Sequence, residues 1–134
     1  MSTSWDGKTY WLVGASEGLG RALAGELAGA GARLCLSARN RDRLEELAAE
    51  LPTPAVVAPL DLRDTASVGS AFASLPPLDG VIYCAGLYEP MSAAEWDADA
   101  AEAMFDVNLT GAARALGAAL PTLVERGGGH IALI

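Results

Sequence analysis

The fold of this chain is decided by the stretch Tyr10-Trp11-Leu12-Val13-Gly14-Ala15-Ser16-Glu17-Gly18-Leu19-Gly20. An apolar strand leads there into a glycine-punctuated turn, and the turn leads into an amphipathic helix. Gly14 permits a sharp turn off the strand, Gly18 leaves no Cβ where a pyrophosphate approaches the backbone, and Gly20 lets the helix pack close to the sheet. The free N–H groups and the positive dipole end of the helix then face the anion. The stretch therefore predicts a site for a diphosphate group.

The composition is typical of one globular domain. The chain has 134 residues, of which 51% are hydrophobic and 19% are charged, and this length fits a single domain. The formal net charge of −8 argues against non-specific nucleic-acid binding, which needs a basic surface. We expect no membrane span and no secretory signal, because no apolar run has the required length or flanking charges.

The cysteines and the histidine do not indicate a metal site. Cys35 and Cys84 lie in strand-like apolar runs, which is typical of reduced core thiols and of the cytoplasm. His130 is the only histidine in the sequence, and no Cys/His spacing suggests zinc. We therefore predict a cytoplasmic protein with no metal, nucleic acid or membrane as a partner.

Strand and helix patterns alternate along the chain, which predicts a parallel sheet covered by helices. Strands are expected over residues 8–13, 33–38, 55–60, 78–84 and 130–134. Asn40 and Asp64 are candidate caps for the second and third helices, and Ser92 with Glu95 forms a capping-box pair. From there to about residue 126 the chain is expected to be largely helical, with a joint at 106–108.

Further motifs follow the glycine turn in a fixed order. They are the acidic residue in Leu60-Asp61-Leu62, the segment Cys84-Ala85-Gly86, the asparagine in Val107-Asn108-Leu109-Thr110-Gly111 and a final strand at residues 129–134. Together with Gly14, Gly18 and Gly20, their order and spacing resemble the N-terminal half of a short-chain dehydrogenase/reductase. The resemblance covers essentially the whole chain.

The resemblance implies a Rossmann-like, doubly wound parallel sheet with strand order 3-2-1-4-5, truncated after the start of strand five. Residues 1–134 are then the NADP-binding Rossmann domain, as the N-terminal part of a longer domain. The cofactor is expected across the carboxyl ends of strands one and four, where the strand order reverses. The residues expected to bind it are Gly14, Ser16, Glu17, Gly18, Leu19, Gly20, Arg39, Asp61, Leu62, Cys84, Ala85 and Gly86.

Arg39 decides which cofactor we expect. It follows the second strand, where NAD-preferring members of the family usually carry a carboxylate. Its guanidinium can bind a 2′-phosphate through two parallel, charge-assisted hydrogen bonds, which favours NADP. The alternative is a solvated arginine that opens the second helix.

Three other positions carry two interpretations each. Asp61 is either the family's adenine contact or a simple turn residue. Asn108 is the candidate catalytic residue, through the family's water-mediated proton relay, or it satisfies a local kink in the helix. Glu17 brings a carboxylate near the phosphates, which is unfavourable unless the side chain points to solvent. In addition, Cys84 replaces the family's asparagine, so the hydrogen bonding around it must differ.

The resemblance implies an NADP(H)-dependent oxidoreductase that acts on a small carbonyl or alcohol substrate. The family's catalytic serine and Tyr-x3-Lys would come after Ile134, so we expect the 134-residue chain alone to be inactive. A catalytically inactive dinucleotide-binding or partner-binding module is the alternative. We also expect either a homo-oligomer or a longer polypeptide whose C-terminal half covers these surfaces, because residues 108–124 carry apolar side chains on more than one helical face and the last strand forms an open edge.

Overall fold

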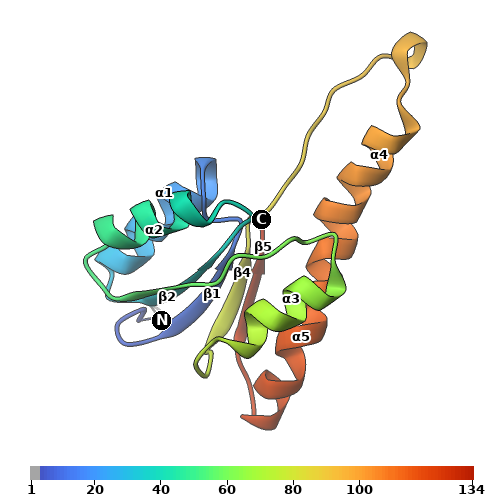
Figure 1. Cartoon of the computed structure of the whole chain (residues 1–134). Coiled ribbons are helices and arrows are strands. Elements are labelled where there is room, and N and C mark those ends of the chain that lie inside the picture. Colours follow the sequence, from blue (N-terminus) through green and yellow to red (C-terminus); the bar gives the residue numbers. More distant parts are fainter. Residues whose placement is uncertain (1–3) are drawn as a thin grey trace.

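A parallel sheet forms the centre of the molecule (Figure 1). The computed structural model describes residues 4–134. Its strands are β1 (Thr9–Val13), β2 (Arg33–Ser37), β3 (Ala55–Val57), β4 (Gly80–Tyr83) and β5 (His130–Leu133). All neighbouring strands pair in parallel, in the order β3-β2-β1-β4-β5. The predicted doubly wound fold with strand order 3-2-1-4-5 is confirmed.

Helices cover both faces of the sheet. They are α1 (Gly18–Gly29), α2 (Arg41–Glu50), α3 (Thr65–Ala73), α4 (Ala98–Phe105) and α5 (Gly111–Glu125). Helices α1 and α2 lie on one face, and α3 and α5 lie on the other (Figure 1). Leu12 of β1 packs in one core with Leu27 of α1, whereas its neighbour Trp11 packs in the other core with Val68 of α3. Because successive side chains of a strand point to opposite faces, both faces of β1 are buried and its sequence is continuously apolar.

The third strand is shorter than predicted. We expected it over residues 55–60, but the regular ladder ends at Val57. The chain nevertheless stays beside β2, because the Ala58 amide donates to the Leu36 carbonyl at 2.9 Å and the Leu60 amide donates to the Ala38 carbonyl at 3.0 Å. The sequence pattern records burial, and Ala58 and Leu60 are buried although they lie outside the ladder.

A buried chain of hydrogen bonds links β1, β2 and the residue that follows β3. The indole Nε1 of Trp11 donates to Ser37 Oγ at 2.8 Å, and the Ser37 hydroxyl donates to the Ala58 carbonyl at 2.6 Å. Trp11 and Ser37 are both fully buried, where an unpaired polar group is costly. The serine therefore satisfies an indole N–H and a carbonyl at once and ties β1, β2 and the end of β3 together.

The predicted starts of the second and third helices are confirmed, whereas the predicted start at Ser92 opens only one short turn. In each case the side chain of the residue before the helix accepts a hydrogen bond from a backbone N–H in the first turn, which satisfies one of the unpaired donors of a helix start. The pairs are Asn40 with the Arg43 amide, Asp64 with the Ala66 amide and Ser92 with the Glu95 amide. Ser92 begins the short 3-10 helix η1 (Ala93–Glu95), so the capping pair starts a single turn and α4 begins later.

The expected joint at residues 106–108 is a π-helical turn. Helix α4 passes into η2 (Asp106–Thr110), and η2 continues directly into α5. The hydroxyl of Tyr83, from β4, donates to the Val107 carbonyl inside this turn. An outside donor at a helix carbonyl is one of the causes that widen a helix locally, and such turns often lie at functional sites.

Gly20→Ala is expected to destabilise the fold. A Cβ at position 20 would lie 1.8 Å from the carbonyl oxygen of Gly14, so the start of α1 would have to move off the turn. We expect the free energy of unfolding, measured by urea titration, to fall by about 1–3 kcal/mol or more. Gly25→Ala is the matched control, because a Cβ there meets no atom within 4 Å and alanine should stabilise α1 by about 0.5–1 kcal/mol. Equal effects of the two substitutions would contradict the close approach at Gly20.

Candidate functional site

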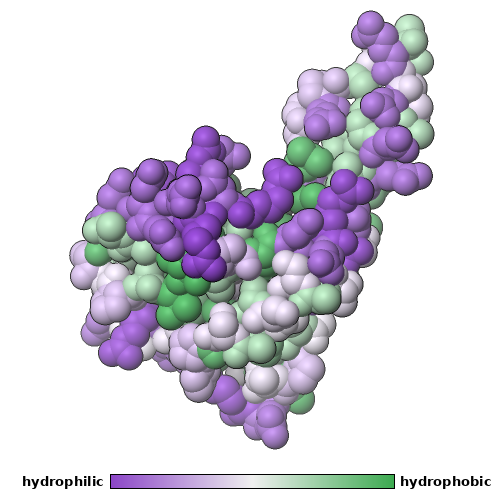
Figure 2. Space-filling model, viewed as in Figure 1, coloured by the Kyte–Doolittle hydropathy of each residue, from purple (hydrophilic) through white to green (hydrophobic). Residues whose placement is uncertain are grey.

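A cleft of about 820 Å³ lies at the carboxyl ends of β1 and β4. The strand order reverses between these two strands. In open α/β sheets, ligands bind at this switch point. In Figure 2 the hydrophilic side chains gather over α2, and hydrophobic residues lie in the hollow between that lobe and the one formed by α3 and α5. The cleft therefore has a polar rim on the side of α2.

Every residue that we expected to bind a cofactor lines this cleft. These residues are Gly14, Ser16, Glu17, Gly18, Leu19, Gly20, Arg39, Asp61, Leu62, Cys84, Ala85 and Gly86. The expected cofactor residues do not include the seven other residues that line the cleft, namely Ala38, Asn40, Arg43, Leu60, Arg63, Leu87 and Val107. Their signal was present but weak: each lies within four residues of a residue that we did single out.

The floor of the cleft is made of backbone. Gly14 has a φ of +93°, and a Cβ there would lie 2.4 Å from the Ala85 nitrogen. The Gly14 amide donates to the Ser37 carbonyl at 2.8 Å, and the Cys84 amide donates to the Val13 carbonyl at 2.8 Å. The ends of β1, β2 and β4 are thus fixed against one another. Gly18, with a φ of +57°, has open space where its Cβ would stand, so a ligand can approach its backbone.

Cys84 stands where the family usually carries asparagine. Its side chain packs, partly buried, against the core on the α1 and α2 face. Burial raises the pKa of this thiol, which keeps it neutral. The residue therefore contributes apolar packing at the end of β4.

The carboxylate of Glu17 points away from the glycine turn formed by residues 14–20. Glu17 is the N-cap residue of α1, but its side chain makes no capping hydrogen bond. It pairs instead with Arg43 of α2, with Glu17 Oε2 lying 2.7 Å from Arg43 Nη1. Arg39 has no carboxylate partner among residues 4–134, although it lines the same cleft.

Asn108 holds the loop that follows β4. Its Nδ2 donates to the Leu87 carbonyl at 2.8 Å, and its Oδ1 accepts from the Leu87 amide at 2.7 Å. Asn108 itself is not part of the cleft lining, whereas Leu87 and Val107 are. The π-helical turn thus presents an amide that fixes one wall of the cleft from behind.

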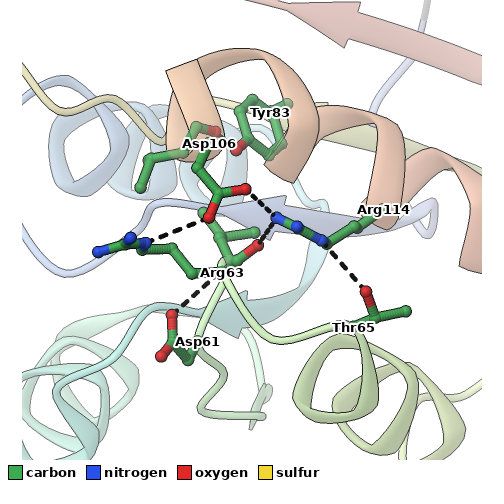
Figure 3. A network of polar contacts seen from close by, with 8 residues as sticks. Asp61, Arg63, Thr65, Tyr83, Asp106 and Arg114 are labelled. Carbon is green, nitrogen blue, oxygen red and sulfur yellow. Dashed lines mark hydrogen bonds and ion pairs between the residues drawn. The ribbon is translucent and has the colours of Figure 1, made fainter. Parts of the chain in front are cut away.

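A polar network joins this π-helical turn to the segment after β3 (Figure 3). Arg114 Nη1 donates to Asp106 Oδ1 at 2.7 Å and to the Leu62 carbonyl at 2.8 Å. The other oxygen of Asp106 accepts from Arg63 Nε at 3.2 Å. The Arg63 amide in turn donates to Asp61 Oδ1 at 2.9 Å. Two arginines therefore hold the cleft residues in place: Arg63 binds Asp61, and Arg114 binds the Leu62 carbonyl.

Two of the acidic and phenolic groups of this region have shifted pKa values. The hydrogen bond from Arg114, followed by the one from Arg63, lowers the pKa of Asp106. Burial raises the pKa of Tyr83 to about 12. Tyr83 therefore stays a hydrogen-bond donor to the Val107 carbonyl at neutral pH, and Asp106 stays an acceptor.

Features of other classes of site were not found in the part of the chain that the structure describes. Residues 4–134 hold no group of three or more His, Cys, Asp or Glu side chains that could bind a metal ion. None of the helices in these residues has the length and apolarity needed to span a bilayer.

The sheet order and the cleft define a doubly wound α/β domain of the Rossmann type, with the cleft where such domains take dinucleotides. A family model described as short chain dehydrogenase matches residues 8–134. The chain therefore belongs to the short chain dehydrogenase family, which is a family of oxidoreductases.

Several known proteins are similar over nearly the whole chain. Sulfoacetaldehyde reductase of Chromohalobacter salexigens is 38% identical over 126 residues, which are 89% of this chain and 50% of that protein. An uncharacterized oxidoreductase of Staphylococcus epidermidis is 32% identical over 128 residues, 92% of this chain and 56% of that protein. The structure of a gluconate 5-dehydrogenase from Burkholderia cenocepacia, in complex with NADP and tartrate, matches with a TM-score of 0.88 at 27% identity and covers 96% of this chain and 53% of that one. The chain thus spans about half the length of the relatives that it matches.

The lowered pKa of Asp106 predicts how stability changes in acid. A carboxyl whose folded pKa lies below its unfolded pKa stabilises the protein above the unfolded value, and this stabilisation is lost as the pH falls through the folded pKa. We expect Asp106→Asn to be less stable than the unchanged protein at pH 7, and the difference to narrow as the pH falls below the ordinary pKa of an aspartate and through the lowered pKa of Asp106. Thermal unfolding across this range measures it, with Glu125→Gln, a carboxylate outside the network, as the control. A difference that is constant with pH would contradict the ion-pair role of Asp106.

Proposed function

We propose that this chain is the NADP(H)-binding part of an oxidoreductase that transfers a hydride to or from a small carbonyl or alcohol substrate. The observation that carries the proposal is Arg39, a guanidinium without a carboxylate partner in residues 4–134, on the wall of a cleft at the switch point of the sheet. Arginine is suited to a 2′-phosphate because it presents parallel N–H donors. The NADP complex of the similar gluconate 5-dehydrogenase supports the choice.

The cleft residues fit such a cofactor. The bare backbone at Gly18 leaves space for a diphosphate in front of the N-terminus of α1, where N–H groups and the helix dipole stabilise an anion. Asp61 and Leu62 would hold the adenine, and Ala85 and Gly86 would line the floor beneath the rest of the cofactor. Bound in this way, the nicotinamide supplies or accepts the hydride.

In this proposal, the residues of this chain position the cofactor and bind its charged groups. The turn from Gly14 to Gly20 would orient the diphosphate, and Arg39 would select the phosphorylated ribose. Asn108 fixes Leu87 through both of its amide atoms, and we propose that it thereby fixes the wall of the site next to the reacting end. A proton relay through Asn108, as in the family, remains part of the proposed catalytic role.

The alternative function is that of a catalytically inactive dinucleotide-binding or partner-binding module. The chain contains no Tyr-x3-Lys, and Lys8 is its only lysine. Both functions use the same cleft, so cofactor binding does not separate them. Turnover of a substrate does. The unpaired thiols Cys35 and Cys84 support our proposal of a reducing, cytoplasmic compartment.

Arg39→Asp is expected to reverse the cofactor preference. The unchanged protein should bind NADPH more tightly than NADH, and the substitution should weaken NADPH binding at least about tenfold, because charge-assisted hydrogen bonds contribute about 1.5–3 kcal/mol. Fluorescence titration with both cofactors measures this. Arg41→Asp is the matched control, because it makes the same change of charge on α2. Arg41 pairs with Glu45 and does not line the cleft. Equal affinity of the unchanged protein for both cofactors would overturn the role of Arg39.

A chain of these 134 residues alone is expected to bind NADPH without turning over substrate. General acid–base catalysis by a positioned side chain contributes roughly 10²–10⁴ to the rate, and this sequence provides no Tyr-x3-Lys for it. The test is a spectrophotometric assay with mass-verified protein and a panel of aldehydes and ketones. Cofactor-dependent turnover by that material would contradict the assignment of catalysis to residues outside this chain.

The chain is also expected to associate with itself. Leu109 and Val124 on the helix from η2 to α5 are 70% and 74% exposed, and Leu133 of the edge strand β5 is 59% exposed. The segment formed by α4 and η2 extends beyond the sheet (Figure 1). An apolar helix face beside an open strand edge favours association. Light scattering should show a mass above 13.7 kDa, and a stable monomer at high concentration would contradict this expectation.

A further inference from the structure

The glycine turn of this chain, residues 14–20, carries the acidic residue Glu17. Its carboxylate neutralises Arg43, an arginine that lines the cleft. Glu17 and Arg43 both line the cleft, and they come from different elements: Glu17 precedes α1, and Arg43 lies in the first turn of α2. Their ion pair, at 2.7 Å, bridges the rim between the turn that faces the diphosphate and the helix that follows Arg39.

The pair changes the balance of charge on this side of the cleft. Without Glu17, two arginines, Arg39 and Arg43, would flank Asn40 and face the site together. With Glu17 in place, Arg43 is neutralised and Arg39 is left as the unpaired cation. A doubly charged 2′-phosphate would therefore meet the free guanidinium of Arg39, while the guanidinium of Arg43 is already bound to Glu17.

The pair is able to open for a ligand. The side chains of Arg43 and Glu17 are 52% and 75% exposed, and ion pairs with this exposure are weak because water competes for both partners. Arginine also has five N–H donors in a planar fork, and the contact with Glu17 uses the Nη1 nitrogen. An incoming phosphate can therefore take Arg43 from Glu17, but it must do so against the attraction of the carboxylate.

We infer that Glu17 competes with the 2′-phosphate of the cofactor for Arg43 and thereby limits the preference of this protein for NADPH over NADH. The inference rests on the proposed function, since it needs a dinucleotide in this cleft. It assigns Glu17 and Arg43, together with Arg39, to the selection of the phosphorylated ribose. Glu17 would act on specificity through Arg43 and not by touching the phosphate.

The experiment is a double-mutant cycle on cofactor affinity. Fluorescence titration gives the dissociation constants of NADPH and NADH for the unchanged protein, Glu17→Gln, Arg43→Gln and the double variant. Removing a carboxylate also lowers the repulsion of the diphosphate that both cofactors share, so the readout is the ratio of the two constants. We expect Glu17→Gln to raise the preference for NADPH about threefold to fivefold, in line with the strength of exposed ion pairs. In the Arg43→Gln background the same substitution should leave the ratio unchanged.

Glu45→Gln is the matched control. Glu45 pairs with Arg41 on the outer side of α2, so this substitution also removes one carboxylate and releases one arginine of the same helix, but neither residue lines the cleft. It should not change the ratio. The same titrations with 2′,5′-ADP and 5′-AMP show whether the effect belongs to the phosphorylated ribose and not to the nicotinamide end.

The possible outcomes separate the inference from the proposed function. A ratio that is unchanged or lowered by Glu17→Gln, or raised equally with and without Arg43, overturns the inference while leaving NADPH binding in place. A protein that binds both cofactors equally, yet shows the expected change on Glu17→Gln, overturns the role of Arg39 and supports that of Glu17. Absence of binding to either cofactor overturns both.

Discussion

The structure depends on one steric constraint, which is the contact of backbone with backbone at the end of β1. Two glycines make it possible: a Cβ at Gly20 would meet the Gly14 carbonyl, and a Cβ at Gly14 would meet the backbone of Ala85. Because neither side chain exists, α1 begins directly on the turn and β4 lies against it. The N–H groups of the helix start then face the same space as the ends of three strands. The position of the cleft follows from this contact.

Arginine–carboxylate pairs hold the walls of the cleft together around that fixed floor. Asp106 accepts from Arg63 and Arg114, which join the π-helical turn to the segment after β3, and Glu17 joins the glycine turn to α2. These segments have no common ladder of backbone hydrogen bonds. Exposed ion pairs weaken as the salt concentration rises, so these links between the walls are more sensitive to salt than the packed floor.

The fold could be predicted because its signals are local. The glycine spacing, the caps at Asn40 and Asp64 and the helix joint are all visible within a few residues of sequence, and the family resemblance added the strand order. The third strand was predicted too long, because burial of Ala58 and Leu60 looks the same inside and outside a ladder. All expected cofactor residues line the cleft, although their binding roles remain predictions.

The charge pairs of the site could not be predicted from the sequence in the same way. Glu17 and Arg43 are 26 residues apart, and Arg63 and Asp106 are 43 apart, so nothing in the local pattern marks them as partners. An exposed arginine on a helix is most often solvated, and no local feature of the sequence distinguishes Arg43 from such a residue. The hydrogen bonds from Asn108 to Leu87 likewise depend on a loop whose path the sequence does not specify.

The hydrogen-bonded tryptophan in the centre of the sheet gives the molecule an optical signature of its own. Trp11 is fully buried with its indole N–H bound to Ser37, while Trp96 is 65% exposed near the start of α4. An indole in a rigid, water-free setting emits at shorter wavelength than one in contact with solvent. The two residues therefore report different parts of the same chain. With the third tryptophan, Trp5, which packs on Tyr10 and His130, replaced by phenylalanine, light from Trp11 follows the integrity of the sheet and light from Trp96 follows events at the projecting helix.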